Sequence, residues 1–112
     1  MKKENRLKRN HEIASVVNKR IKVFNKSYII YYQPNDLGKV RVAISVSKKY
    51  GHAFERNKAK RIVRNIVRPY LDKINNFDIV IVIKNYSKEC DYQELNDNLI
   101  KLIKHMIYKN KE

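Results

Sequence analysis

The chain has 112 residues, 43% of them hydrophobic, and a formal net charge of +15. This length fits one domain, and the composition allows a real but modest core. Cys90 is the only cysteine, which excludes an intrachain disulfide, and the three histidines lack metal-ligand spacing. No apolar run reaches the roughly 18 residues of a membrane span, and the basic N-terminus leads into no signal sequence. We therefore expect a cytoplasmic protein without membrane association.

The positive charge is concentrated in the first two thirds of the chain. Residues 1–68 hold 19 Lys and Arg against 4 Asp and Glu, whereas residues 69–112 hold 7 of each kind. A charge that served solubility alone could be spread anywhere, but a binding surface must be concentrated. The pattern therefore favours a nucleic-acid partner over an anionic membrane or general solvation.

The first elements predicted along the chain are a basic arm, a helix and a strand. Residues 1–9 should form a mobile basic arm, and Asn10 should cap a helix over residues 10–19. Residues 26–33 are rich in β-branched and aromatic side chains, which predicts a strand, and a turn follows at residues 34–39. Alternation leaves open which face of this strand lines a groove. The two candidate sets are Ile29, Tyr31 and Gln33, and Tyr28, Ile30 and Tyr32.

The next predicted strand, residues 40–47, alternates between an apolar face and a small, polar face. The apolar set, which should face the core, is Val40, Val42, Ile44 and Val46. The opposite set, which could form the floor of a groove, is Arg41, Ala43, Ser45 and Ser47.

A loop, a long helix and a strand should follow. The loop covers residues 48–54 and bends at Gly51, and the helix covers residues 55–71. Residues 77–84 are apolar at nearly every position, so we expect a strand that is buried on both faces.

The chain should end in an amphipathic helix over residues 91–108. Asp91 followed by Glu94 resembles a capping box at its start. Its apolar stripe, which should face the core, is Tyr92, Leu95, Leu99, Leu102, Ile103, Met106 and Ile107. The resulting order α-β-β-α-β-α predicts an α/β protein of the two-layer α+β type, with three helices on a small mixed sheet.

A helical wheel of residues 55–70 separates a cationic side from an apolar side. The cationic and amide positions are Arg56, Asn57, Lys60, Arg61, Arg64, Asn65 and Arg68. The apolar positions are Ala59, Ile62, Val63, Ile66, Val67 and Tyr70. Like charges at i and i+4 destabilise a helix by ~0.2–0.5 kcal/mol per pair, and Glu55 is the only nearby acid. A merely solvated face would interleave the two signs, so this one favours a phosphate-binding surface.

The residue types on this surface suit a nucleic acid. Arg grips phosphate bidentately and stacks on bases, and Ser47, Lys48 and Lys49 extend the patch into the preceding loop. The pattern does not by itself separate RNA from DNA, but strand tyrosines favour RNA or single strands, because unpaired bases stack on rings. The sequence has no carboxylate cluster, nucleophile–base pair or Gly-rich phosphate loop, so we predict no catalytic residue.

The stretch RVAISVSKKYGHAFERNKAKRIVR, residues 41–64, closely resembles the signature region of the bacterial ribonuclease P protein component. The hallmark of that family is an Arg-Asn-x-x-Lys-Arg-x-x-Arg helix after a Ser-Lys-Lys-x-Gly loop. The opening MKKENRLKRNHEI is also similar to the start of the family, so the resemblance covers nearly the whole chain, residues 1–112, as one RNA-binding domain. It implies the fold of the second domain of ribosomal protein S5, with an unusual left-handed βαβ crossover.

The resemblance also implies a function. In this family a catalytic RNA uses Mg2+ to cleave the 5′ leader from precursor tRNA, and the protein binds that RNA and the leader without an obligate protein partner. The residues implied to face the RNA subunit are Ser47, Lys48, Lys49, Arg56, Asn57, Lys60, Arg61, Arg64 and Arg68. The residues implied to bind the leader are Ile13, Val17, Tyr31 and Arg41. The family often has Phe at the first two of these positions, and the resemblance does not identify which residues bind metal ions directly.

Two alternatives stay open at this point. A ribosomal or other structural RNA-binding protein would have the same charge and fold class, but no reason to carry the joined loop and helix motif. A protein-only nuclease would need clustered carboxylates. Five acids of the second half are instead dispersed along the chain, at Asp72, Asp78, Asp91, Glu94 and Asp97.

Overall fold

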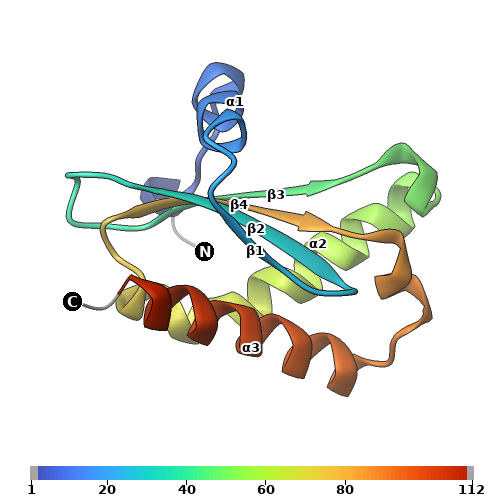
Figure 1. Ribbon diagram of the computed structural model, residues 1–112. Helices are drawn as coiled ribbons and strands as arrows, with labels where there is room; N and C mark the ends of the chain where they lie inside the picture. The colour runs from blue at the N-terminus through green and yellow to red at the C-terminus, as the bar shows by residue number, and fades with distance from the viewer. Residues whose placement is uncertain (1–2, 111–112) are drawn as a thin grey trace.

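The computed structural model describes residues 3–110 and contains a four-stranded mixed sheet with three helices (Figure 1). The helices are α1 (Asn10–Asn18), α2 (Ala53–Val67) and α3 (Tyr92–Lys109). The strands are β1 (Lys22–Phe24), β2 (Tyr28–Pro34), β3 (Arg41–Val46) and β4 (Phe77–Ile83). Short 3-10 turns lie at Lys3–Asn5, Lys48–Tyr50, Arg68–Lys73 and Asn85–Glu89. Within residues 3–110, no helix is both long and apolar enough to cross a membrane.

The strands are ordered β1-β2-β4-β3 across the sheet. β2 pairs antiparallel with both β1 and β4, whereas β3 and β4 are parallel and are joined through α2. This arrangement confirms the predicted mixed α/β fold with three helices. The left-handed sense of the β3-α2-β4 crossover stays a prediction of the resemblance. The sequence prediction missed β1, because a strand of three residues is too short to show alternation.

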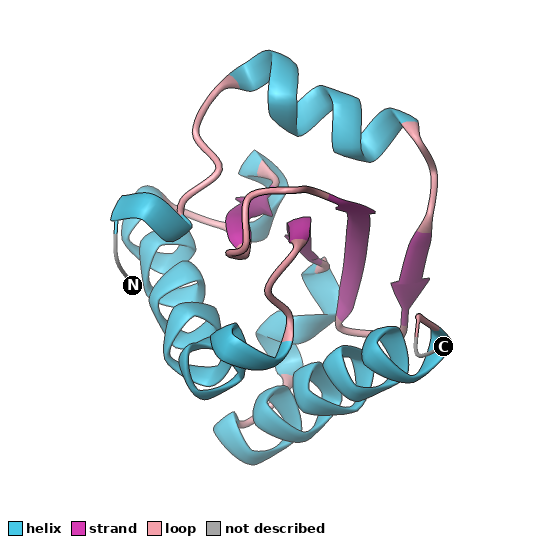
Figure 2. Cartoon of the chain, turned by 90° about the vertical axis from the view of Figure 1, so that its left-hand side faces the viewer, coloured by secondary structure: helices cyan, strands magenta, loops and turns pink. Residues whose placement is uncertain are grey.

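The helices cover the two faces of the sheet unequally. α2 and α3 pack on one face, and α1 crosses the other (Figures 1 and 2). The central strand β4 contributes to both sides, since Ile79 and Ile81 are buried toward α2 and α3 and Val80 is buried toward α1. The predicted burial of this strand on both faces is therefore confirmed. The short α1 leaves part of its own face open, and that opening is the groove considered below.

The alternation of β2 and β3 decides which side chains face the groove. Tyr28 and Tyr32 are buried in the core under α2 and α3, whereas Tyr31 is half-buried on the α1 face. In β3, Val42 is buried in the same core as predicted, and Ala43 lies on the α1 face. The choice between the two tyrosine sets, which the sequence left open, falls on the set that contains Tyr31.

The N-terminal segment differs from the prediction of a mobile basic arm over residues 1–9. Its first two residues lie outside the described part, but residues 3–9 lie against the sheet. Leu7 is only 4% exposed, and its amide donates to the Val42 carbonyl at 2.9 Å. Asn5 Nδ2 also donates to the Val40 carbonyl at 2.8 Å. The segment is held in place because Leu7 is buried and because the Val40 and Val42 carbonyls, at the edge of the sheet, accept its hydrogen bonds.

Helix boundaries also differ from the sequence prediction, and α2 begins at Ala53 instead of residue 55. The predicted helix 55–71 is α2 followed by a 3-10 turn, because Pro69 near the start of that turn has no amide to continue the α-helical pattern. At α1 the N-cap is Arg9 and makes no side-chain cap bond, so Asn10 is the first helical residue rather than the cap.

The last helix follows its predicted pattern with one exception. Asp91 is the N-cap of α3, and its carboxylate accepts the Glu94 amide at 2.9 Å, as expected. The stripe residues from Leu95 to Met106 are buried, but Tyr92 is 57% exposed. The prediction that Tyr92 faces the core is therefore wrong, because burial of the stripe begins one turn later, at Leu95.

Candidate nucleic-acid interface

The cationic side of α2 is held rigidly because its opposite side is buried. Ala59, Val63, Ile66 and Val67 are buried against the sheet and α3, which fixes the rotation of the helix. Arg56, Lys60 and Arg64 are half-buried at the border of that contact. The more outward positions, which are exposed to solvent, are Asn57, Arg61, Asn65 and Arg68. The predicted motif residues therefore share one face of one helix.

This face lacks compensating negative charge. Among residues 3–110, the ion pairs are Arg41 with Glu12, Arg41 with Asp78, and Lys88 with Glu55, so no Lys or Arg of α2 has a carboxylate partner. The buried Arg56 Nε also has no hydrogen-bond partner within this part of the chain. An unsatisfied buried donor costs free energy in the isolated protein. The surface is therefore built at the expense of stability.

The only acid of α2, Glu55, is turned away from the cationic face. Its carboxylate accepts the His52 amide at 3.0 Å and pairs with Lys88 at 3.2 Å. The hydrogen bond from the His52 backbone, and then the contact with Lys88, lower the pKa of Glu55 below its usual value. Glu55 thus stabilises the start of α2 and leaves the arginines unneutralised.

The loop before α2 adds its cations at the same end of the helix. Ser47, Lys48 and Lys49 are exposed, whereas Tyr50 is only 8% exposed and anchors the turn in the core. Ser47 Oγ lies 3.5 Å from Asn85 Oδ1, which links the turn to the segment after β4. The predicted loop residues therefore continue the cationic surface beyond the N-terminus of α2.

A second surface lies on the α1 side of the sheet, beside a hollow that Ile13 and Ala43 line, and we call it the α1 groove. Ile13 and Val17 of α1 and Tyr31 of β2 belong to one apolar cluster, together with the buried Leu7, Val16 and Val80. All three of the predicted groove residues are only half-buried. The structure therefore brings together three of the four residues that the resemblance implied for the leader.

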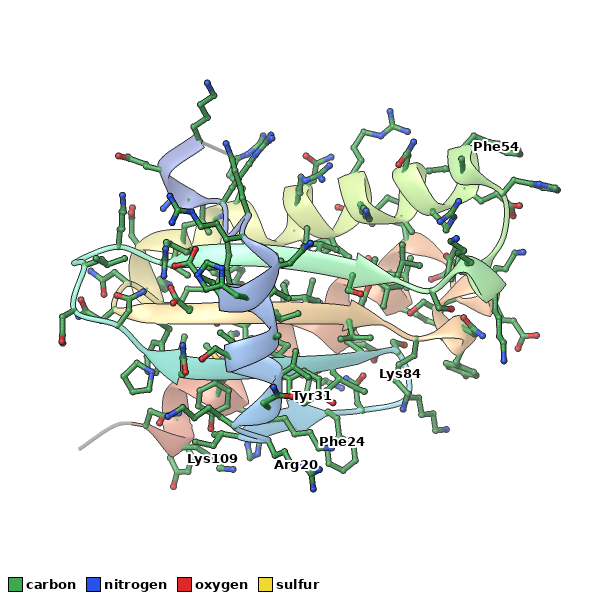
Figure 3. The ribbon with its side chains drawn as sticks, turned by 90° about the horizontal axis from the view of Figure 1, so that it is seen from above. Arg20, Phe24, Tyr31, Phe54, Lys84 and Lys109 are labelled. Carbon is green, nitrogen blue, oxygen red and sulfur yellow. The ribbon has the colours of Figure 1, made fainter. Side chains whose placement is uncertain are left out.

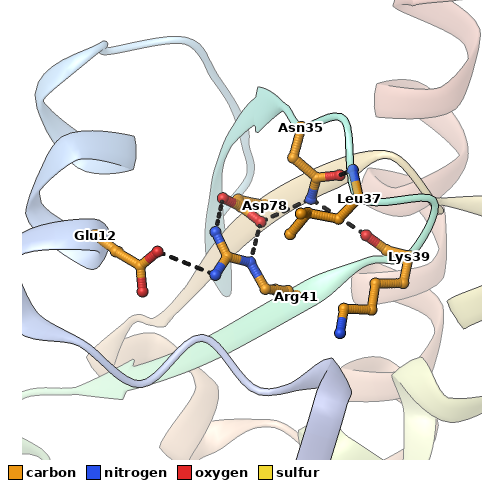
Figure 4. A network of polar contacts seen from close by, with 6 residues as sticks. All are labelled: Glu12, Asn35, Leu37, Lys39, Arg41 and Asp78. Carbon is orange, nitrogen blue, oxygen red and sulfur yellow. Dashed lines mark hydrogen bonds and ion pairs between the residues drawn. The ribbon is translucent and has the colours of Figure 1, made fainter.

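The fourth predicted leader residue, Arg41, is held by two acids (Figure 4). Its Nε and Nη2 donate to the two oxygens of Asp78 at 2.9 and 2.7 Å, and its Nη1 donates to Glu12 at 3.0 Å. Asn35 Nδ2 donates to the same Asp78 carboxylate at 2.7 Å. The hydrogen bonds to Asp78 raise the pKa of Arg41. Because it pairs with Glu12 of α1 and Asp78 of β4, Arg41 primarily has a structural role and connects these two elements to β3.

The cationic face of α2 and the α1 groove meet along the N-terminal segment. Arg64 and Ile13 line one hollow of about 330 Å³. Arg6 and Lys8, on either side of the buried Leu7, line it as well. Sequence reasoning placed these two cations in a mobile arm and missed their position. The buried Leu7 between basic residues was the available signal.

Two further residues on the groove side were missed because β1 was missed. Lys22 and Phe24 alternate with the buried Val23, so they share the groove face of the sheet. Phe24 is 64% exposed. The signal in the sequence was a cation–apolar–aromatic triplet directly before the predicted strand.

The sheet, the cationic helix and the adjoining groove together define a small basic nucleic-acid-binding protein. Comparison with known proteins makes the class more specific. The Ribonuclease P family model matches residues 1–107. The ribonuclease P protein component of Mycoplasma mycoides is 36% identical over 95% of this chain and 99% of its own length. That of Streptococcus agalactiae is 35% identical over 93% and 95%.

Solved structures agree with the sequence comparisons. A ribonuclease P protein mutant from Staphylococcus aureus superimposes with a TM-score of 0.87 at 28% identity, covering 93% of this chain and 89% of that one. The ribonuclease P protein from Thermotoga maritima gives 0.81 at 28% identity, with coverage of 89% and 96%. The chain belongs to the ribonuclease P protein family. It is the protein subunit of a ribonucleoprotein endoribonuclease that processes the 5′ end of tRNA.

Proposed function

We propose that the cationic face of α2 and the turn before it bind the catalytic RNA of ribonuclease P, and that the α1 groove binds the 5′ leader of precursor tRNA. We further propose that the assembled enzyme uses Mg2+ and acts in the cytoplasm. The observation that carries this proposal is the row of arginines on α2 that has no acidic partner within residues 3–110.

The RNA-binding face would act through charge and geometry together. The residues proposed to contact the RNA subunit are Ser47, Lys48, Lys49, Arg56, Asn57, Lys60, Arg61, Arg64 and Arg68. Guanidinium groups can bind phosphates bidentately. Because they stand on a rigid helix, binding does not have to order a flexible backbone, as it would if they stood on a loop. Since these cations repel one another in the free protein, a bound polyanion relieves a cost that the fold already bears.

The groove would hold a single strand by its bases. Ile13 and Val17 offer aliphatic surface for a base or ribose, and Tyr31 offers a ring. Arg41 closes one end of the groove, and we assign it a supporting role because its guanidinium is already bound by two carboxylates. Leader recognition would then depend mainly on Tyr31 and on the surrounding positive charge.

The protein would lower the Mg2+ demand of the enzyme through its positive charge. Cations placed between two RNA strands reduce their mutual repulsion, so fewer Mg2+ ions must be recruited from solution. Within residues 3–110, no three His, Cys, Asp or Glu side chains gather as a metal site.

The test is reconstitution with a bacterial ribonuclease P RNA. Cleavage of precursor tRNA is measured at low Mg2+ with a long leader and with a one-nucleotide leader. We expect the protein to restore cleavage and to favour the long leader. Protein that binds the RNA but never stimulates cleavage would overturn the proposal.

A matched pair of variants separates the α2 face from general charge. Arg61→Ala combined with Arg64→Ala should raise the Mg2+ concentration needed for half-maximal cleavage. Lys101→Ala combined with Lys104→Ala removes the same charge from exposed positions of α3 and should leave it unchanged. Equal effects of the two pairs would show that net charge alone, and not the α2 face, is responsible.

A further inference from the structure

We propose that Phe24, supported by Lys22, forms a second stacking site for the leader at the outer edge of the sheet. This inference rests on the proposed leader-binding role of the α1 groove and extends it. Figure 3 shows Phe24, Tyr31 and Arg20 gathered at the same edge, beside the C-terminal end of α1.

The strand register places the Phe24 ring in line with the groove floor. Phe24 is paired with Ile29 of β2, which is paired with Val82 of β4, which is paired with Ser45 of β3. These four side chains form one row across the sheet, spanning three strand spacings or about 14 Å. The row starts at Ser45 and ends at the Phe24 ring. Ser45 lies two residues before Ser47, which is proposed to face the RNA subunit.

Lys22 links the new ring to the groove. Its amino group lies 5.6 Å from the centroid of the Tyr31 ring and 5.8 Å from that of the Phe24 ring. Both distances fall within the range of a cation–π contact. One ammonium thus holds two rings beside each other and places a positive charge where a phosphate between two stacked bases would lie.

The exposure and charge of this edge suit a nucleic acid strand. Phe24 is 64% exposed, whereas Ile13, Val17 and Tyr31 are all half-buried, so Phe24 offers the more accessible ring on this face. Residues 13–35 contain four Lys or Arg and no Asp or Glu. An exposed ring within a segment whose charged residues are all cationic fits a base with its phosphates better than it fits a protein surface of ordinary composition.

The edge position also explains how the ring would be used. The groove itself offers one half-buried ring, Tyr31, beside the aliphatic Ile13 and Val17. Aliphatic side chains pack against a base but do not stack as a ring does. A leader long enough to cross the whole row would gain a second stacked base at Phe24, and a shorter leader would not reach it.

The experiment measures the affinity of the reconstituted enzyme for precursor tRNAs whose leaders are lengthened one nucleotide at a time. Phe24→Ala should weaken binding of the long leaders about tenfold, in line with the loss of one base–ring stack. Binding of the one-nucleotide leader should not change, and Phe24→Tyr should retain the wild-type affinities. The control is Tyr108→Ala, which removes a 76% exposed ring from α3.

The outcomes separate this inference from the proposal on which it rests. If wild-type enzyme prefers long leaders and Tyr31→Ala weakens them, but Phe24→Ala does not, the edge site is wrong and the groove stands. If neither variant changes affinity and long leaders are not preferred, the groove itself fails. Thermal unfolding checks that each variant is folded. If sedimentation shows that Phe24→Ala dissociates a dimer without changing leader affinity, the ring serves self-association and the inference is overturned.

Discussion

Replacing Arg41 by Met should destabilise the protein strongly, although Arg41 is only one of 26 Lys and Arg residues. Asp78 is 3% exposed, and two of its hydrogen bonds come from Arg41. Met preserves much of the length of the side chain but leaves the buried carboxylate without its cation. The effect is therefore the cost of an unpaired buried charge and not the loss of packing.

The structure sets the size of this effect. Removing one partner of a buried ion pair typically costs ~3–5 kcal/mol. Here the Arg41 side chain is 22% exposed and Asn35 still donates to Asp78, so the lower end of the range, about 3 kcal/mol, applies. For a domain of this size, that corresponds to a fall of about 12 °C in the unfolding temperature.

The assay is urea and thermal unfolding followed by far-ultraviolet circular dichroism. The matched control is Arg61→Met, because Arg61 is exposed, has no carboxylate partner within residues 3–110, and lies in a helix where Met is tolerated equally well. We expect the control to stay within about 0.5 kcal/mol of the wild type. If Arg41→Met is no less stable than Arg61→Met, the assignment of Arg41 as a structural tie is refuted.

Four further predictions concern Glu55, Gly51, Arg61 and Ile13. Because the pKa of Glu55 is lowered, the stabilisation by its carboxylate is present above the ordinary value of 4.5 and is lost as pH falls through the lowered value. In urea titrations, the difference in stability between wild type and Glu55→Gln should therefore be constant at neutral pH and vanish in acid. A Cβ on Gly51 would lie 2.7 Å from Glu55 Oε1, so Gly51→Ala should lower the urea midpoint, though by less than Arg41→Met, and an unchanged midpoint would contradict this contact. Arg61→Ala should reduce the slope of log K for RNA binding against log salt by about 0.7–0.9, as measured by filter binding, if Arg61 contacts one phosphate. Ile13→Phe should strengthen long-leader binding about fivefold by adding a ring to the α1 groove, and unchanged affinity would show that the aliphatic residue is no handicap.

Much of the fold could be predicted because its elements have strong local patterns. β4 is apolar at nearly every position, α3 has a long stripe and an Asp91 cap, and α2 has two chemically opposite sides. The segments that were missed or misplaced carry weak local signals. β1 is three residues long, and Leu7 is a single apolar residue among cations, so neither shows a period.

The helical part of the candidate site could be predicted from the sequence pattern, whereas the part on the strands could not. The α2 motif could be assigned to one surface because helix periodicity alone fixes which residues share a face. For strands, alternation yields two sets of side chains but cannot say which of them meets the core. That is why alternation could not separate Tyr31 from Tyr28 and Tyr32. The family resemblance implied Tyr31, and the position of α1 shows that Tyr31 lies on the α1 face.

The sequence by itself determined the charge, its concentration in residues 1–68, and the motif that identifies the family, because these depend only on residue type and spacing. Only the tertiary structure decided how the cations are used. It buries Asp78 beneath Arg41, turns Glu55 toward Lys88, and gives the arginines of α2 no carboxylate partner among residues 3–110. The reason is that the strength of a charge interaction depends on distance and burial, and these are set by contacts between residues far apart in the chain.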